Sequence, residues 1–226
     1  EAMHSVRTGQ TAVEKAVGVP VFEFFPRNPE LSEIFNNAMT AFSAFVVPAA
    51  LEAYDFRGIR TIVDVAGGHG QVLMSILQKY PEMRGVLFDL DHVIAGAVPR
   101  IRAAGLEGRI ETQSGDFFKA VPAGGDAYVL KHIIHDWDDE RALTILRNIR
   151  TAMGGARGKV ILLESVLPAG NVPDFGKIID LEMLAMPGGR ERTAEEFEAL
   201  FARAGFELTR IVPTQSPLSV IDAVAL

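Results

Sequence analysis

Two histidines lie three residues apart in the segment KHIIHDWDDE (131–140), which holds the densest group of chemically active side chains in the chain. His135 is followed at once by an acid and by Trp137, the only tryptophan of the protein. Three kinds of site fit such a group: a metal site, a catalytic base with supporting carboxylates, or the acidic first turn of a helix. The chain has no cysteine, so thiolate ligands are excluded, and the His-x-x-His spacing alone is a weak indication of zinc. We therefore expect no metal here.

The acids from residue 138 onward have a simple structural explanation. Asp138, Asp139 and Glu140 precede a run of apolar residues at helical spacing, and negative charge at a helix start complements the helix dipole. We predict that these three acids begin a helix, with Asp138 as its N-cap. His132 is expected to be a packed structural residue. Asp136 is a candidate for positioning a substrate hydroxyl.

A glycine-rich loop, VDVAGGHGQ (63–71), follows a short apolar run and opens a helical pattern. Glycines allow backbone amides to approach a ligand, and the helix N-terminus beyond them favours an anion. The dinucleotide fingerprint G-x-G-x-x-G is not met, because Leu73 stands where the third glycine belongs. Asp89 ends the next apolar run, where a carboxylate accepts hydrogen bonds from ribose hydroxyls. Asp116, in SGDFF, is a candidate acceptor from an adenine amino group, with Phe117 packing on the ring.

Strand-like and helix-like stretches alternate through the middle of the chain. Short apolar runs predict strands buried on both faces, and the stretches between them carry apolar residues at helical spacing. This alternation predicts an α/β fold with a mostly parallel, doubly wound sheet and helices on both faces. The expected strands are 60–66, 84–90, 109–118, 126–133 and 159–167.

The C-terminal part of the chain follows a different plan. Thr193 and Glu196 form a capping box at the start of a helix. Two further strand-like runs, 206–213 and 218–225, are joined too closely for a parallel return, so they must pair antiparallel. A parallel sheet that ends in an antiparallel hairpin is not the usual dinucleotide-binding plan.

Composition and charge limit the classes of partner. The net charge is −7 at pH 7, with 48% hydrophobic and 23% charged residues. We find no basic stripe of the kind that neutralises phosphates, so we expect no nucleic-acid partner. No apolar run reaches the length of a membrane span and the N-terminus lacks a signal-peptide pattern, so we expect no membrane partner and a cytoplasmic location.

Taken in order, these motifs resemble a known family, the S-adenosylmethionine-dependent O-methyltransferases of the plant caffeate/flavonoid type and their bacterial small-molecule relatives. The family has a Rossmann-like class I methyltransferase fold, whose seven-stranded sheet also ends in an antiparallel hairpin. The elements that carry the resemblance are Asp64-x-Ala66-Gly67-Gly68-His69-Gly70, Phe88-Asp89-Leu90, Gly115-Asp116-Phe117-Phe118, Lys131, His135-Asp136-Trp137 and PGGRERT (187–193).

The resemblance implies S-adenosylmethionine as the cofactor and a hydroxylated aromatic or polyketide-like small molecule as the acceptor. It implies that His135 is the catalytic base and that Glu164 and Glu191 flank and orient it. Two such carboxylates would raise the pKa of the histidine and bring it closer to the value of about 10 typical of a phenol. The implied cofactor-binding residues are Ala66, Gly67, Gly68, Asp89, Leu90, Asp116, Phe117, Lys131 and Trp137. The implied acceptor-binding residues are Met39, Asp136 and Met183.

The sequence departs from the family in two places that concern this site. The family usually has glycine where Ala66 stands, and its extra methyl group crowds the methionine pocket. The family also has an N-terminal winged-helix dimerisation domain, and this sequence starts after most of it. We therefore expect residues 1–58 to be a helical segment belonging to that region, residues 59–226 to be the cofactor-binding catalytic domain, and the full-length protein to be a homodimer.

Three alternatives remain open at this point. A homologue with the same cofactor that hydroxylates or decarboxylates its substrate would keep the glycine loop, although the retained histidine and both glutamates favour methylation. An NAD(P)-dependent oxidoreductase is disfavoured by the missing third glycine and by the terminal hairpin. A non-catalytic binding or dimerisation module would have no need for the full set of polar residues.

Overall fold

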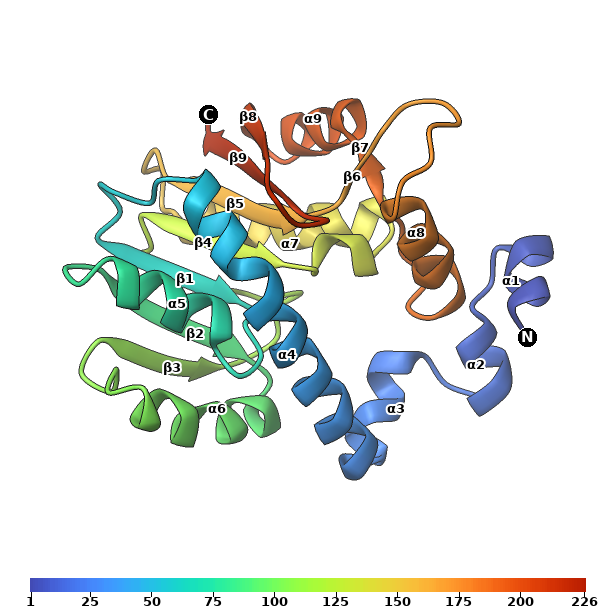
Figure 1. The fold of residues 1–226 in the computed structure, drawn as a ribbon, viewed down its shortest axis with the longest axis horizontal. Helices are drawn as coiled ribbons and strands as arrows, with labels where there is room; N and C mark the ends of the chain where they lie inside the picture. The colour runs from blue at the N-terminus through green and yellow to red at the C-terminus, as the bar shows by residue number, and fades with distance from the viewer.

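The computed structural model describes residues 1–226, and its centre is a seven-stranded sheet with strand order β3-β2-β1-β4-β5-β9-β8 (Figure 1). The first five strands pair in parallel, whereas β9 is antiparallel to both β5 and β8. The expected mostly parallel sheet with a terminal hairpin is therefore confirmed. The strands are β1 (Thr61–Val65), β2 (Arg84–Asp89), β3 (Ile110–Ser114), β4 (Ala127–Lys131), β5 (Lys159–Glu164), β8 (Phe206–Pro213) and β9 (Ser219–Ala225).

Helices cover both faces of the sheet (Figure 1). Successive side chains of a strand point to opposite faces, so Ile62 joins the core under α4, α5 and α6, whereas Val63 joins the core under α7 and α9. Burial on both faces explains why these strands are continuous apolar runs. The helices are α4 (Pro29–Ala53), α5 (Gln71–Lys79), α6 (Asp91–Ala103), α7 (Asp139–Ala152) and α9 (Ala194–Arg203).

The N-terminal helices α1 (Ala2–Thr8), α2 (Ala12–Val17) and α3 (Val21–Arg27) extend away from the sheet toward α8 (Gly176–Ala185), which α1 contacts (Figure 1). The C-terminal half of α4 instead lies in the sheet core, where Val46 and Val47 are buried. The division of the chain at residue 58 stays a prediction, and α4 contributes to the core of the following part.

The length of α4 was not expected from the sequence. Its most apolar window has a hydropathy of 1.4, so this helix is long and apolar enough, by length and composition only, to cross a membrane. The expectation that no segment reaches such a length is wrong on this count. Only 22% of that window is buried in the protein.

A second, two-stranded sheet lies beside the main one. Strands β6 (Val166–Leu167) and β7 (Arg192–Thr193) pair in parallel, with Val166 opposite Arg192. This pairing brings together two segments that are far apart in the chain, one just after β5 and one just before α9. A glutamate of the candidate site precedes each of these short strands: Glu164 ends β5, two residues before β6, and Glu191 directly precedes β7.

Candidate active site

His135 lies on a single turn of 3₁₀ helix, η1 (Ile134–Asp136), directly after β4. The carboxylate of Glu164, at the end of β5, accepts hydrogen bonds from the backbone N–H groups of Ile133 and Ile134 at 3.0 and 2.8 Å. The adjacent strand end therefore holds the backbone turn that presents the histidine.

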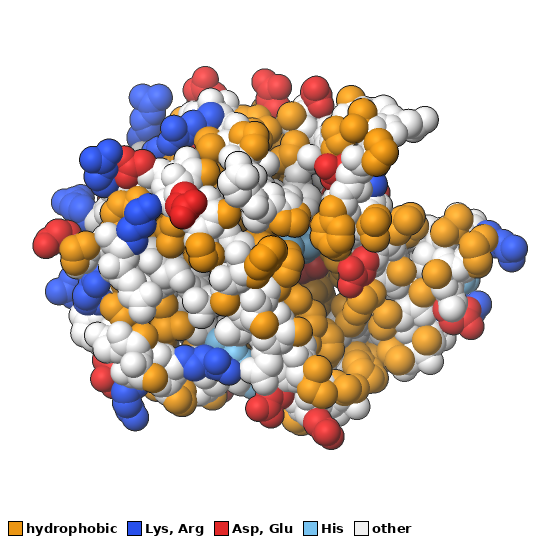
Figure 2. Space-filling model, viewed as in Figure 1, with side chains coloured by type: hydrophobic (Ala, Val, Ile, Leu, Met, Phe, Trp, Pro, Cys, Tyr) orange, Lys and Arg blue, Asp and Glu red, His pale blue; other side chains and the backbone are white.

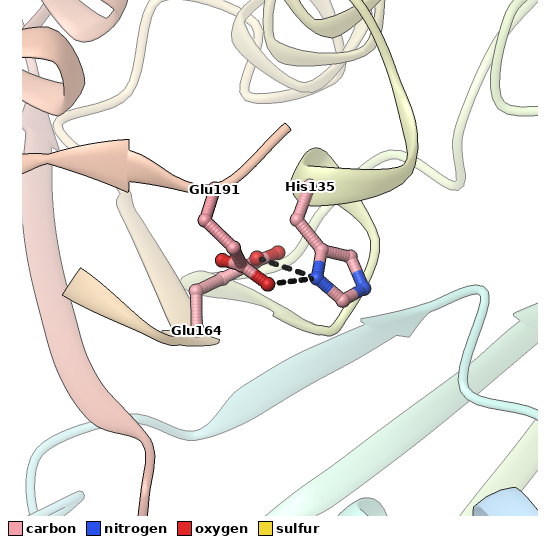
Figure 3. A group of neighbouring side chains, drawn as sticks. All are labelled: His135, Glu164 and Glu191. Atoms are coloured by element: carbon pink, nitrogen blue, oxygen red, sulfur yellow. Dashed lines mark hydrogen bonds and ion pairs between the residues drawn. The ribbon is translucent and has the colours of Figure 1, made fainter. Parts of the chain in front are cut away.

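The two glutamates expected beside His135 are both there, with different tasks. Glu191 Oε1 lies 2.7 Å from His135 Nδ1, which is a hydrogen bond, whereas Glu164 Oε2 lies 3.9 Å from the same nitrogen. Figure 3 shows both carboxylates on one side of the imidazole, facing Nδ1, with Nε2 turned away from them. Glu191 thus fixes the ring and its tautomer, and Glu164 acts on it through charge and through the backbone.

The electrostatic surroundings make His135 a stronger base than an ordinary histidine. Burial lowers its pKa, but the negative charges of Glu164 and Asp136 and the hydrogen bond to Glu191 outweigh burial and raise the pKa to about 9. A neutral His135 with its Nδ1 proton held by Glu191 has Nε2 free to accept a proton.

Asp136 lies on the open side of the histidine. Its Oδ1 is 3.5 Å from His135 Nε2, and burial raises the pKa of this carboxyl to about 7. A carboxyl at this place faces any group that approaches Nε2. The role of Asp136 in placing a substrate hydroxyl stays a prediction.

The same three side chains are the chain's candidate metal ligands. One ligand atom each from His135, Glu164 and Glu191 lies within 4.8 Å of the others. The Nδ1–Oε1 separation of 2.7 Å is a hydrogen-bond length, shorter than the roughly 3.3 Å between ligand atoms around tetrahedral zinc. The rings of His132 and His135 lie nearly parallel, at 4.5 Å and 30°, so their in-plane lone pairs do not converge on one point. The geometry favours a hydrogen-bonded base over a metal centre.

The glycine loop joins β1 to α5 and is folded back on the end of β2. The N–H groups of Ala66 and Gly67 donate to the carbonyl of Phe88, and that of Gly68 donates to Asp89 Oδ2 at 2.8 Å. A Cβ at Gly67 would overlap with Asp64 and Leu87, which explains the glycine. Burial raises the pKa of Asp64, beneath the loop, to about 7.

Ala66 adopts a left-handed conformation, with φ of 55°. This region favours glycine, the residue that the family usually has there. The departure therefore introduces backbone strain as well as a methyl group at the expected methionine end of the cofactor. Only one other non-glycine residue of the chain, His132, has a positive φ.

The remaining expected cofactor residues lie at the same edge of the sheet, where the parallel strands end. Asp89 closes β2, and its Oδ1 accepts from the N–H of Leu90, which is 46% exposed. Asp116 follows β3 and accepts from the N–H of Phe118, so it also stabilises a turn. Lys131 ends β4.

Trp137 is buried and packs edge-on against the rings of Phe117 and Phe118, at centroid distances of 6.1 and 4.8 Å. Its indole Nε1 is buried without a hydrogen-bond partner. The aromatic group thus joins the segment after β3 to the segment that carries His135. The role of Trp137 and Phe117 in binding the cofactor stays a prediction. An unpartnered buried donor is a group that a ligand can satisfy.

A family model for the O-methyltransferase domain matches residues 2–207. The chain belongs to this O-methyltransferase family. It is 46% identical over 223 residues to the phenazine O-methyltransferase PhzM of Lysobacter antibioticus, covering 99% of this chain and 65% of that protein. It is 40% identical to the 3-amino-4-hydroxybenzoate 4-O-methyltransferase of Streptomyces cremeus, covering 92% of this chain and 57% of that enzyme. The chain thus spans less than two thirds of the length of these relatives.

Solved structures agree with the family assignment. The O-methyltransferase NcsB1 from neocarzinostatin biosynthesis, in complex with S-adenosylmethionine and 2-hydroxy-5-methyl naphthoic acid, aligns with a TM-score of 0.91. It is 34% identical, and the alignment covers 100% of this chain and 67% of that one. The fold expected from the resemblance, a class I methyltransferase fold, is therefore confirmed.

In this O-methyltransferase-family chain, one turn of α4 contacts both the glycine loop and the segment that carries His135. The hydroxyl of Thr40 lies 3.1 Å from Nδ1 of His69 in the glycine loop, and Phe42 stacks on His132 at 5.2 Å. Met39 lies on the same turn, and Met183 is buried on α8. Figure 2 shows hydrophobic side chains gathered around a hollow between the region of α3 and α4 and that of α8, which suits an apolar acceptor.

Arg192 is a site residue that the sequence reasoning missed. It is 1% exposed, and its guanidinium donates to the carbonyls of Ile134 and Trp137, on either side of His135, at 3.1 and 2.9 Å. It also pairs with Asp139 at 2.8 Å. Every residue has the same backbone carbonyl, so a sequence does not show which carbonyls an arginine will bind. The only sequence signal for Arg192 was its charge within the RERT motif.

The acids after Trp137 and a glycine of the PGGRERT segment have roles that the sequence did not fully predict. Asp138 is the N-cap of α7 as predicted, accepting from the N–H of Arg141, but Asp139 is the ion-pair partner of buried Arg192 rather than merely a first-turn acid. A Cβ at Gly189 would overlap with the backbone of His135 and Asp136. The glycine therefore lets the PGGRERT segment lie directly against the turn that carries the base.

Proposed function

We propose that the protein is an S-adenosylmethionine-dependent O-methyltransferase that methylates a hydroxyl of a small aromatic or polyketide-like metabolite. The observation that carries the proposal is His135, which is hydrogen-bonded through Nδ1 to buried Glu191 and whose Nε2 is turned away from both glutamates (Figure 3). The relatives support the acceptor class, because two of them are named for methylating a phenazine and an aminohydroxybenzoate and the third is in complex with a naphthoic acid.

The residues of the loop edge fit the proposed cofactor. Gly68 has a left-handed φ of 59° and open space where a side chain would stand, so its backbone can approach a ligand closely. The N-terminus of α5 behind it suits the carboxylate of the methionine end. Asp89 accepts from ribose hydroxyls, and the segment of Asp116 and Phe117 holds the adenine.

Bound S-adenosylmethionine supplies a methyl group that is already activated by its positive sulfur. The protein must therefore align the acceptor oxygen and remove its proton. His135 Nε2 takes that proton, Glu191 holds the Nδ1 proton and stabilises the imidazolium, and Asp136 hydrogen-bonds the acceptor group.

The pKa values support this division of tasks. A phenol with a pKa of about 10 and an ordinary histidine near 6.5 differ by about 3.5 units, a cost of roughly 5 kcal/mol for full proton transfer. With the pKa of His135 at about 9 the difference falls to about one unit, or roughly 1.4 kcal/mol. The carboxylates thus lower the cost of the proton-transfer step itself, whereas at neutral pH the imidazolium of His135 must first lose its own proton.

The pH dependence of the reaction provides the first test of the base. His135 must be neutral to accept a proton, so we expect kcat/KM to rise with pH through an apparent pKa of about 9. In Glu191→Gln the stabilising negative charge is lost, so the rising limb should move to lower pH by about 1–2 units. The maximal rate should fall as well, because the weaker base also loses its tautomer control.

The control for this pH profile is Glu198→Gln, which changes an exposed glutamate of α9. Its profile should match that of the unmodified protein. A Glu191→Gln profile that stays in place, or moves to higher pH, would show that another group titrates in the pH–rate curve.

Asp89 provides a separate test of the cofactor site. Asp89→Ala removes the carboxylate that holds Gly68 and is proposed to bind the ribose, so we expect the Kd for S-adenosylhomocysteine to rise by about 10–100-fold. With saturating cofactor, kcat should change by less than about threefold, since the base is untouched. Asp91→Ala, at an exposed acid two residues away on α6, is the control for isothermal titration calorimetry. Equal affinity in Asp89→Ala and Asp91→Ala would remove Asp89 from the proposed site.

The activity itself is tested by ligand choice and by product. Calorimetry with S-adenosylhomocysteine and with NADH should show binding of the first alone; tight binding of NADH alone would contradict the proposal. Mass spectrometry of reactions with phenolic acceptors should show a methylated product and an equal amount of S-adenosylhomocysteine. A hydroxylated or decarboxylated product would instead support the alternative reactions of this fold.

The organisation of the whole protein is also a proposal. We infer a homodimer and a cytoplasmic location, with residues 1–58 belonging to a dimerisation and acceptor-covering region and residues 59–226 forming the catalytic domain. Support comes from family membership and from α1 to α3, which extend away from the sheet (Figure 1).

A further inference from the structure

His132 has a buried polar atom for which the proposed reaction has no use. Its Nε2 is buried and has no hydrogen-bond partner. Unpartnered buried polar atoms are rare in native proteins and call for an explanation, such as a ligand that satisfies them. The residue lies directly after Lys131, the last residue of β4, and three residues before the proposed base.

The backbone of His132 is held in an unfavourable conformation. Its φ is 54°, in the left-handed region that non-glycine residues rarely adopt, although histidine enters it more often than most. The N–H of His132 donates to the carbonyl of Leu163 on β5 at 3.2 Å, which anchors the turn. Conformations of this kind cluster at active sites and ligand clamps.

The ring of His132 is placed by two aromatic neighbours. It stacks on Phe42 of α4 at 5.2 Å and 24°, and it lies beside the ring of His135 at 4.5 Å and 30°. Since Glu191 occupies Nδ1 of His135, an acceptor hydroxyl approaches Nε2 of His135. A planar arene whose hydroxyl lies at Nε2 of His135 has the imidazole of His132 as its neighbour, because the two histidine rings are 4.5 Å apart and tilted by 30°.

The charge state of His132 suits such a contact. Burial, together with the positive charges of His135 and Lys131, holds the pKa of His132 well below its ordinary value. The neutral ring has one N–H donor and one lone-pair acceptor, so it can bind a hydroxyl, an amine, a carboxylate or a ring nitrogen.

We propose that His132 forms a second polar subsite that binds a hydrogen-bonding substituent adjacent to the reacting hydroxyl of the acceptor ring. The acceptor class is thereby narrowed to arenes with two neighbouring polar groups. This inference rests on the proposed function, because it takes His135 Nε2 as the place where the reacting hydroxyl binds. The packed structural role expected for His132 from the sequence is also present, in its stacking on Phe42.

The test uses catechol and phenol, which differ by one hydroxyl, as acceptors for the purified protein. The unmodified protein should prefer catechol in kcat/KM by about 10-fold or more. His132→Phe keeps an aromatic ring for stacking and removes the nitrogen. It should lower kcat/KM for catechol by about 10-fold, mainly through KM, and for phenol by less than about threefold.

Matched variants separate this role from a general loss of structure. His132→Asn tolerates the left-handed backbone and keeps a donor and an acceptor, so it should retain part of the catechol preference. His132→Gly tolerates the backbone without any polar group and should lose the preference, and it replaces His132→Phe if circular dichroism shows that the phenylalanine variant is unfolded.

The outcomes distinguish the subsite from the proposed function. If His132→Phe or His132→Gly keeps the catechol preference, or if the unmodified protein methylates both compounds equally, the subsite is overturned while the methyltransferase proposal stands. If the unmodified protein methylates neither, the proposed function fails for these acceptors. In that case, calorimetry measures the Kd of catechol and of phenol for the S-adenosylhomocysteine complex of each protein. Weaker catechol binding by His132→Phe or His132→Gly than by the unmodified protein supports the subsite, and an unchanged Kd overturns it.

Discussion

Replacing His135 by alanine should lower kcat by about 10²–10⁴-fold, the contribution typical of a positioned general base. The Nε2 of His135 is the strongest base on the acceptor side, because the pKa of His135 is raised to about 9 and that of the adjacent Asp136 to about 7. Glu164 and Glu191 are both engaged on the Nδ1 side. The variant should still transfer the methyl group to the neutral hydroxyl, slowly, because the acceptor remains aligned but no base removes its proton. The measurement is single-turnover methylation with both substrates saturating.

Cofactor binding should survive this substitution. Most of the proposed cofactor contacts lie at the ends of β1, β2 and β3, and the substitution leaves the other two, Lys131 and Trp137, in place, so the Kd for S-adenosylhomocysteine should change by less than about threefold. His92→Ala, at an exposed histidine of α6, is the control and should leave both quantities unchanged. An unaltered kcat in His135→Ala would mean that the base is another group. Loss of cofactor binding would mean that the substitution acts through the fold.

The second large effect is expected at Arg192. Arg192→Met keeps an unbranched side chain of similar length but removes the donors to the carbonyls of Ile134 and Trp137. The carbonyl of Trp137 loses its donor at a cost of about 1–3 kcal/mol, whereas that of Ile134 keeps the N–H of Trp137, so the free energy of unfolding should fall by about 1–3 kcal/mol. Asp139 is 44% exposed, so its unpaired charge stays hydrated and adds little.

Urea unfolding followed by circular dichroism measures this change. The matched control is Arg203→Met, which breaks the neighbouring surface ion pair with Glu140 and should cost less than about 1 kcal/mol. A similar cost for both variants would show that Arg192 does not stabilise the turn. If folded Arg192→Met also shows the rising limb of its pH profile at lower pH, then the arginine positions His135 against Glu191 as well as stabilising the turn.

Sequence patterns predicted the framework of this protein well, because the framework depends on periodicity. The buried strands are continuous apolar runs, and the Thr193–Glu196 capping box is present as expected at the start of α9. The hairpin followed from the short connection before residue 218, where a parallel return is impossible. These features are local, so neighbouring residues are sufficient to define them.

The parts of the site that escaped prediction depend on contacts with the backbone. Glu164 was expected beside the histidine but mainly binds N–H groups of the η1 turn, and Arg192 binds carbonyls of the same turn. Gly189 is required by the closeness of two backbone segments. No side-chain pattern encodes such partners, since every residue offers the same amide. The length of α4 was missed because charged and polar residues interrupt its apolar content.

The short β6–β7 pairing has a consequence for how this fold can diversify. It joins the segments that follow Glu164 and Glu191, so the stretch from residue 168 to 188, including α8, is a loop closed at its base by this pairing and by the contact of Gly189 with the backbone of His135. Doubling the length of such a loop costs only about 0.6 kcal/mol, whereas the distance between the two glutamates is set by the pairing. Insertions or exchanges in this loop can therefore alter which molecules enter the hollow without altering the proton-accepting pair. This arrangement allows the acceptor range to change independently of the strength of the base.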